Sequence, residues 1–226
     1  MSHSQNPQPY LTADGSSTLF SPRFDQHYHS VHGAIQESMH VFIKAGLEAR
    51  DWQREEPMHI FEMGLGTGLN AWLTWISERG YPVHYTALEA YPLSRDQWSG
   101  LNFPQQLHAP DGQTRLNALH EADWNKSQLL GEGFALKKVQ NRLEDFEPEN
   151  KYDLVYWDAF APGAQPELWT EEVFCRIFEW MNPAGIWVSY CAKGVVRRAL
   201  QAAGFEVERI PGPPGKREML RARKPE

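Results

Sequence analysis

Residues 61–70 read Phe-Glu-Met-Gly-Leu-Gly-Thr-Gly-Leu-Asn and carry the strongest local signal in the chain. The apolar residues at 58–62 predict a β-strand that runs directly into this stretch, and the apolar spacing over 71–76 predicts a helix after it. A strand that meets glycines can turn sharply and let its backbone approach a ligand closely. The stretch therefore predicts a ligand-binding turn between a strand and a helix. A tight turn without a ligand is the plainer alternative.

The spacing of the glycines bears on which ligand the turn binds. They stand at 64, 66 and 68, whereas the dinucleotide pattern places its third glycine at the position of Leu69. Glu62 precedes the turn, and a carboxylate there is unfavourable beside a pyrophosphate but suits the ammonium group of a methionine moiety. Glu89 ends the next predicted strand, where a carboxylate can accept hydrogen bonds from ribose hydroxyls. We therefore favour S-adenosyl-L-methionine, and keep a nicotinamide-dependent oxidoreductase and a non-catalytic binding module as alternatives.

Strands and helices alternate along the rest of the chain. Seven strands are predicted, at 58–62, 84–89, 134–139, 152–157, 186–190, 205–210 and 218–222. Helices are predicted at 30–47, 71–76, from 91 onward, near 124–130, at 170–181 and at 194–203. This alternation indicates a mostly parallel seven-stranded sheet, and the Pro-Gly loop 211–215 indicates a C-terminal antiparallel hairpin. The order resembles the α/β, class I (Rossmann-like) methyltransferase fold, with residues 1–50 as an N-terminal extension packed on the substrate side of a domain at 51–226.

Asp158 comes directly after the apolar strand predicted at 152–157. In open α/β sheets, ligands bind outside the carboxyl ends of the strands, so this carboxylate is expected in the crevice. Its neighbours Tyr156, Trp157 and Phe160 favour a raised pKa for Asp158 unless a cation comes near. An ammonium must lose a proton before its nitrogen attacks a methyl group, and a carboxylate can orient it and take that proton. We predict Asp158 as the catalytic group in an amine methylation; capping of the following turn is the alternative.

Composition and charge limit the classes of partner that the protein can bind. The chain has 226 residues and a formal net charge of −7, which taken alone argues against nucleic acid as a partner. From Lys193 onward, however, nine basic residues stand against four acidic ones, so a phosphate-rich partner could be held there; a solvated basic tail is the alternative. A run of apolar residues long enough for a membrane span is missing, and Cys175 and Cys191 have no metal-ligand spacing. We expect a cytoplasmic protein with reduced thiols and no membrane partner.

The chain resembles the family formed by MnmD and the methyltransferase domain of bifunctional MnmC. Four blocks carry the resemblance: residues 12–16 with 24–30 and 33–38; residues 62–70; residues 158–162 with 166–170; and residues 194–198 through 204–205 to 215–219. The family methylates 5-aminomethyl-2-thiouridine at the tRNA wobble position, giving the 5-methylaminomethyl form, so the resemblance implies tRNA as the partner, at its anticodon region. A flavin-dependent domain does not follow Glu226, so we expect no oxidase activity in this chain.

The resemblance also implies site residues. The expected cofactor-binding residues are Glu62, Gly64, Gly66, Gly68, Asn70, Glu89, Asn141 and Phe160. The expected substrate-facing residues are Tyr28, His29, Ser30 and Glu37. With tRNA as the partner, the basic C-terminal part adds five expected phosphate contacts: Lys193, Arg197, Arg198, Lys216 and Arg217. Many relatives carry Asp where this chain has Asn141, so its contact with adenine stays open beside a role as a turn residue. The histidines at 27, 29 and 32 have no convincing further ligands nearby, and we predict no metal.

Overall fold

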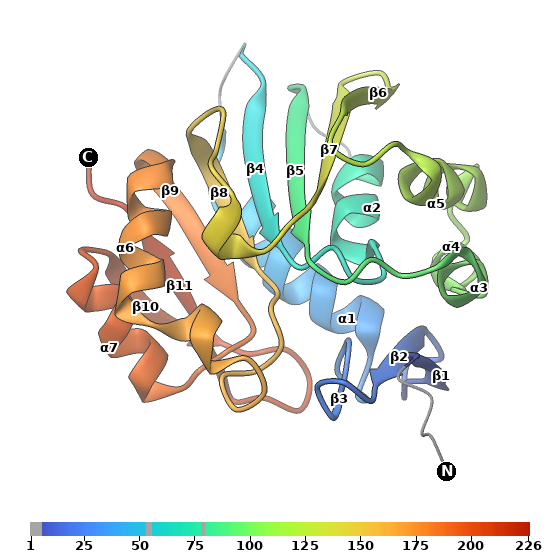
Figure 1. Ribbon diagram of the computed structural model, residues 1–226, viewed down its shortest axis with the longest axis horizontal. Coiled ribbons are helices and arrows are strands. Elements are labelled where there is room, and N and C mark those ends of the chain that lie inside the picture. Colours follow the sequence, from blue (N-terminus) through green and yellow to red (C-terminus); the bar gives the residue numbers. More distant parts are fainter. Residues whose placement is uncertain (1–5, 53–55, 78–79) are drawn as a thin grey trace.

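The computed structural model describes residues 6–52, 56–77 and 80–226. Its centre is an eight-stranded sheet in the order β10-β11-β9-β8-β4-β5-β7-β6 (Figure 1). Five neighbouring strands from β9 to β7 run parallel, and antiparallel strands lie at both edges. The predicted class of fold is therefore confirmed, with one strand more than the seven expected.

The strands follow the buried apolar runs of the sequence. Their bounds are Met58–Met63 (β4), Val83–Glu89 (β5), Ser127–Gly131 (β6), Phe134–Gln140 (β7), Tyr152–Trp157 (β8), Met181–Ser189 (β9), Glu206–Pro211 (β10) and Glu218–Arg223 (β11). The hairpin of β10 and β11 is antiparallel as predicted, and β11 inserts between β10 and β9. Residues 182–185 lie inside β9, next to an irregularity in its pairing with β8.

Successive residues of the central strands face opposite sides of the sheet, and each side is covered by helices. Ile60 and Tyr156 belong to the core under helices η1, α2 and α5, whereas Phe61 and Trp157 belong to the core under α6 and α7. The helices are Ala34–Ser38 (α1), Met39–Leu47 (η1), Leu69–Ile76 (α2), Arg95–Trp98 (α3), Phe103–Gln106 (α4), Gly112–Glu121 (α5), Leu143–Asp145 (η2), Pro166–Trp169 (η3), Glu171–Trp180 (α6) and Gly194–Ala202 (α7). Within the described ranges, each helix is too short or too polar to cross a bilayer.

The helix predicted at 30–47 differs from the structure at its start and in its type. It begins at Ala34, after Gly33, and from Met39 to Leu47 it has the wider hydrogen-bonding pattern of a π-helix. Gly46 explains how this helix packs: a Cβ atom there would lie 3.1 Å from side-chain atoms of both Tyr156 and Val188. The missing side chain lets the helix approach strands β8 and β9 closely.

Two other expectations were wrong in detail. The short helix predicted near 124–130 is instead the edge strand β6, which pairs with β7 and leaves Leu129 74% exposed. The helix expected to begin at 91 begins at Arg95, where the Ser94 side chain caps it in a capping box with Gln97. Both errors concern short elements, of four and five residues.

A small antiparallel sheet precedes the main one. Its strands are Gln8–Leu11 (β1), Ser17–Ser21 (β2) and Gln26–His27 (β3), in that order. Figure 1 shows this sheet near the end of the main sheet at which β4 and β5 finish. Asn102 ties it to the main domain, because its side chain accepts from Ser17 N at 2.7 Å and donates to Gly15 O at 2.9 Å. The N-terminal segment is thus fixed at the carboxyl edge of the sheet.

Candidate active site

The glycine turn has the backbone conformation that only glycine adopts without strain. Gly64, Gly66 and Gly68 all have positive φ, at 89°, 50° and 73°. A Cβ atom at Gly64 would lie 3.0 Å from Asp158 O, and one at Gly66 would lie 3.0 Å from the Tyr28 ring. The three glycines therefore form a cradle with no room for side chains, as expected for a backbone that approaches a ligand.

Glu89 is held against this cradle by backbone amides. Its Oε2 accepts from Gly66 N at 3.0 Å and its Oε1 accepts from Tyr91 N at 2.8 Å. Burial raises the pKa of Glu89, and these hydrogen bonds oppose the rise. Each carboxylate oxygen can accept a further hydrogen bond, so the carboxylate is oriented and still able to bind hydroxyl groups.

Asn70 joins two acidic side chains at the start of α2. Its Nδ2 donates to Glu62 Oε1 at 2.9 Å and to Asp158 Oδ2 at 2.8 Å. Glu62 is fully buried beneath the turn, and among the described residues its Oε2 has no hydrogen-bond partner. Burial, together with the charge of Asp158, raises the pKa of Glu62 well above its ordinary value. A buried carboxyl with an unpaired oxygen fits a site that binds a cation.

Asp158 has the raised pKa that the sequence predicts. Burial is the main cause and brings the pKa to about 7, from an ordinary value of 3.8. The charge of Glu37 contributes to this rise of the pKa, whereas the hydrogen bond from Asn70 and the charge of Lys216 oppose it. A carboxyl group with this pKa exchanges its proton readily near neutral pH, which suits acid–base work.

A cavity of about 290 Å³ opens beside these groups. This volume is at the small end of the range for small-molecule sites, roughly 300–1,000 Å³. Ten of the predicted site residues line it: Tyr28, His29, Ser30, Glu37, Gly64, Gly66, Glu89, Asp158, Phe160 and Lys216. Three more predicted residues lie behind the cavity lining: Glu62, Gly68 and Asn70. Asn70 donates to Asp158, which lines the cavity, and to Glu62, and the Gly68 amide donates to Leu65 O in the turn.

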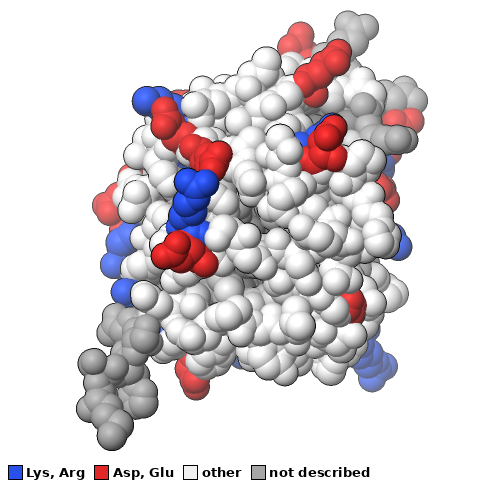
Figure 2. Space-filling model, turned by 90° about the vertical axis from the view of Figure 1, so that its right-hand side faces the viewer, with Lys and Arg blue, Asp and Glu red and all other residues white. Residues whose placement is uncertain are grey.

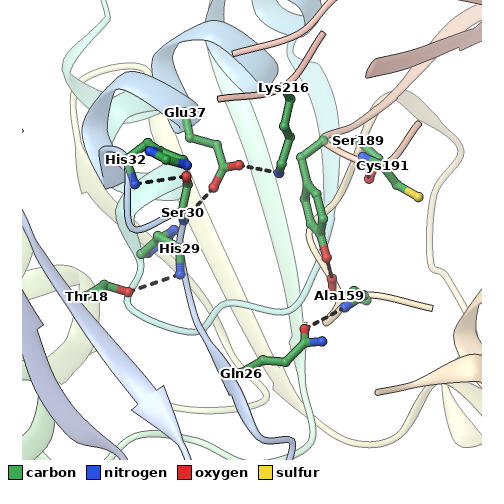
Figure 3. A network of polar contacts seen from close by, with 12 residues as sticks. Thr18, Gln26, His29, Ser30, His32, Glu37, Ala159, Ser189, Cys191 and Lys216 are labelled. Carbon is green, nitrogen blue, oxygen red and sulfur yellow. Dashed lines mark hydrogen bonds and ion pairs between the residues drawn. The ribbon is translucent and has the colours of Figure 1, made fainter. Parts of the chain in front are cut away.

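One wall of the cavity is an ion pair between distant parts of the chain. Glu37 lies between Ser30 and Lys216 (Figure 3): its Oε2 accepts from Ser30 N at 2.8 Å and its Oε1 accepts from Lys216 Nζ at 2.6 Å. The Lys216 ammonium also lies 4.1 Å from the centroid of the Tyr190 ring. Lys216 was predicted as a phosphate contact; its ammonium pairs with Glu37 at the cavity, and contact with a phosphate stays a prediction.

The opposite wall is aromatic. The Phe160 ring stacks on Phe24 with centroids 4.5 Å apart and meets the edge of Tyr28 at 5.1 Å. Gln26 Oε1 accepts from Ala161 N at 3.2 Å, which ties the N-terminal segment to the loop after Asp158. Phe24, Gln26 and Tyr190 were missed as site residues; for the first two, their place in the same sequence block as Tyr28 was an available signal.

The other predicted residues lie apart from the cavity. Asn141 donates from its backbone to Glu89 O at 3.2 Å, but its side chain bonds to Asp145 O and Arg142 N in the following turn. Lys193, Arg197, Arg198 and Arg217 are outside the residues that line it. Contact of Asn141 with adenine, and of these basic residues with phosphates, therefore stays a prediction.

The three histidines at 27, 29 and 32 have separate surroundings. The His27 ring packs against Phe20 and Tyr10, and His32 is exposed. His29 is buried and its Nε2 lies 2.6 Å from Thr67 Oγ1. Within the described part of the chain, no group of three or more His, Cys, Asp or Glu side chains could hold a metal ion. Cys175 and Cys191 are free thiols.

Comparisons with known proteins agree with this geometry. Residues 115–225 match the family model described as S-adenosyl-L-methionine-dependent methyltransferase. The tRNA 5-methylaminomethyl-2-thiouridine biosynthesis bifunctional protein MnmC of Cupriavidus necator is 32% identical over 94% of this chain and 33% of its own length, and that of Cupriavidus metallidurans is 32% identical over 96% and 34%. The chain thus spans about a third of the length of these curated relatives.

A solved structure covers the chain almost completely. The crystal structure of MnmC2 from Aquifex aeolicus matches with a TM-score of 0.80 and 27% identity, over 98% of this chain and 71% of that one. The chain is thus similar to MnmC proteins over nearly its full length. The matching family model confirms the prediction of S-adenosyl-L-methionine as the cofactor, and the nicotinamide alternative is not favoured. The MnmC resemblance inferred from the four sequence blocks is confirmed as well.

Proposed function

We propose that this protein transfers a methyl group from S-adenosyl-L-methionine to the 5-aminomethyl group of 5-aminomethyl-2-thiouridine at the tRNA wobble position. The product is the 5-methylaminomethyl nucleoside. The observation that carries the proposal is the place of Asp158: its carboxyl group faces the same cavity as the glycine cradle and Glu89. A proton acceptor and a cofactor cradle thus meet in one small cavity, as methylation of an amine requires.

The cofactor site follows from the chain's own groups. Glu89 would hold the ribose hydroxyls, and the cradle of Gly64, Gly66 and Gly68 would lie against the methionine moiety, with Glu62 and Asn70 behind it. The cofactor supplies an electrophilic methyl group on sulfur. The aromatic ring of Phe160 would cover the site from the side of the N-terminal segment.

The acceptor amine would be bound by Asp158. Because Asn70 Nδ2 donates to Oδ2, we assign Oδ1 to the ammonium of the substrate. The carboxylate orients the ammonium and accepts one of its protons, which frees the lone pair on nitrogen for attack. After transfer, the proton leaves the site from Asp158, whose pKa of about 7 makes this release easy at neutral pH.

Residues 1–50 would form the substrate side of the site in a two-part chain, with 51–226 as the methyltransferase domain. Tyr28, Ser30 and Glu37 come from this segment and line the cavity next to Asp158. A wobble nucleoside must leave its stack to reach such a cavity, and a wall of aromatic and polar groups suits an extruded base.

A tRNA would approach over the basic residues that are not paired within the protein. On the C-terminal hairpin, Arg209, Arg221 and Arg223 pair with Glu218, Glu208 and Glu206. Among the described residues, Lys193, Arg197, Arg198 and Arg217 have no ion-pair partner, and we propose them as phosphate contacts. On the face that carries α3–α5, Figure 2 shows scattered Lys and Arg, intermixed with Asp and Glu. Such a tRNA-modifying role places the protein in the cytoplasm.

The test is direct methyl transfer. The purified protein is incubated with labelled S-adenosyl-L-methionine and tRNA that carries 5-aminomethyl-2-thiouridine, and the nucleosides are then separated and identified by mass. Label in 5-methylaminomethyl-2-thiouridine is the expected result. Matched tRNA with unmodified uridine at the wobble position is the control. No label in either tRNA, from protein that binds the cofactor, would refute the proposed substrate.

A further inference from the structure

Thr67, in the middle of the glycine turn, is held by the buried His29 and the half-buried His120. The His29 ring nitrogen Nε2 lies 2.6 Å from the Thr67 hydroxyl oxygen. On the other side of the turn, His120 Nε2 lies 2.9 Å from Thr67 O, and because a carbonyl only accepts, this nitrogen is the donor. Thr67 itself is 1% exposed and lines the cavity. The turn is therefore fixed from both sides at a single residue.

Each histidine is fixed in turn by its surroundings. His29 donates from its backbone to Thr18 Oγ1 at 3.0 Å, as Figure 3 shows, and its ring meets the edge of Phe103. The His120 ring stacks on Trp98 with centroids 4.7 Å apart, and its carbonyl accepts from Lys138 Nζ at 2.6 Å. Burial lowers the pKa of both histidines to about 4, so both rings are neutral at physiological pH.

The two histidines belong to different parts of the site. His120 lies at the end of α5, within the methyltransferase domain. His29 instead lies in the N-terminal segment, between Tyr28, whose ring packs on Gly66, and Ser30, whose amide donates to Glu37. One hydrogen bond thus connects the cofactor turn to the wall of the cavity that faces the acceptor amine.

We propose that the His29–Thr67 hydrogen bond couples cofactor binding to tRNA binding, with His29 as a positioning residue. This inference rests on the proposed function. A cofactor bound against the turn would hold Thr67 in place and, through the His29 hydrogen bond, the backbone of residues 28–30 as well. Cofactor and tRNA therefore favour the same position of this segment, and each raises the affinity of the protein for the other. This role differs from the direct substrate contact predicted for His29.

The experiment uses S-adenosylhomocysteine as the cofactor probe and 5-aminomethyl-2-thiouridine tRNA as the partner. Calorimetry gives the dissociation constant of each, alone and with the other saturating. For the unmodified protein we expect each ligand to lower the dissociation constant of the other by the same factor, about fivefold or more. We call this ratio the coupling factor. Thr67→Val removes the hydroxyl without changing the shape of the side chain greatly. It should weaken cofactor binding about tenfold and bring the coupling factor close to one.

Conservative and matched variants separate this role from a structural one. Thr67→Ser keeps the hydroxyl and should restore both values. His29→Phe should reproduce Thr67→Val, and the same replacement at the exposed His84 on β5 should change neither value. Circular dichroism and thermal melting confirm that each variant is folded.

The outcomes distinguish the two proposals. If the unmodified protein binds no S-adenosylhomocysteine, the proposed function fails. If it binds both ligands, but Thr67→Val and His29→Phe keep its coupling factor, the proposed coupling is overturned and the function stands. A coupling factor of one in the unmodified protein also overturns it.

Discussion

The two halves of the site are built in different ways. The cofactor half comes from one continuous stretch, in which β4, the glycine turn and α2 follow each other directly and Glu89 ends the adjacent strand. The substrate half is assembled from the N-terminal segment and from Lys216, which pairs with Glu37 across 179 positions of the chain. Asp158 lies between the halves and is linked to the first by Asn70. Local geometry thus determines where the cofactor binds, whereas long-range packing determines what the cofactor meets.

The sharpest way to separate the halves is to replace the group between them. Asp158→Asn removes the proton acceptor and keeps a side chain of the same size. Methyl transfer should fall about 10³-fold, the usual contribution of a general base, while the dissociation constant for S-adenosylhomocysteine changes little. Single-turnover kinetics with labelled cofactor measures the first quantity and calorimetry the second. Turnover close to that of the unmodified protein would remove Asp158 from the mechanism.

A change confined to the cofactor half comes next. Glu89→Ala removes the carboxylate that accepts from Gly66 and Tyr91 and that we assign to ribose. Cofactor affinity should fall on the order of a hundredfold, because hydrogen bonds to charged groups contribute most to binding. Affinity for tRNA in the absence of cofactor should stay as it is. Equal losses for both ligands would show that Glu89 supports the fold rather than the cofactor.

The substrate half is tested by breaking its ion pair. Lys216→Met should lower kcat/KM for tRNA about tenfold and leave cofactor affinity unchanged, since Lys216 pairs with Glu37 and lies over the Tyr190 ring, neither of which belongs to the glycine turn. The exposed Lys126 on the far edge is a matched control. A loss of cofactor affinity as large as the loss in kcat/KM would contradict the division of the site into two halves.

Both members of this ion pair shift the pKa of Asp158 and therefore the pH profile of kcat/KM. Asp158 must be ionised to accept a proton, so kcat/KM should rise with pH through about 7. Lys216 lowers the pKa of Asp158 and Glu37 raises it. Lys216→Met should therefore move the midpoint of the profile to higher pH, and Glu37→Gln should move it to lower pH. Unmoved midpoints in both variants would mean that another group controls the profile.

The smallest effect is expected at the surface. Arg198→Gln removes one of the proposed phosphate contacts and should weaken tRNA binding about threefold at physiological salt. In a plot of log affinity against log salt concentration, the magnitude of the slope should decrease by about one. Binding by fluorescence anisotropy over a salt series measures both. An unchanged slope would remove Arg198 from the interface.

The contrast between the halves also explains what could be read from the sequence. The order of strands, the glycine turn, Glu89 and Asp158 were predicted correctly in position because each signal is local: an apolar run, a glycine spacing or a strand end. β6 was not, because its five residues include no buried side chain and only its pairing with β7 makes it a strand. The apolar periodicity of 30–47 predicts a helix but does not report its π type at Met39–Leu47, nor the close approach of Gly46 to Tyr156 and Val188.

The site shows the same limit. The sequence names Glu37 and Lys216 through family resemblance, but their pairing follows only from the place of the loop between β10 and β11 beside α1. His29 was expected to contact substrate, and its contact with Thr67 depends on how the small N-terminal sheet is docked. His120 carried no motif at all. Side chains that act through another residue leave little trace in a sequence pattern.

The position of β11 has a consequence for synthesis of the protein. Of the strands in this sheet, β11 leaves the ribosome last, yet it lies between β9 and β10, which are made before it. Strand β10 therefore has no partner in the sheet until β11 has been made, and Lys216, two residues before β11, reaches Glu37 only when the hairpin forms. The cofactor half can assemble on the nascent chain. The catalytic cavity is completed only after the final turn of the hairpin has emerged.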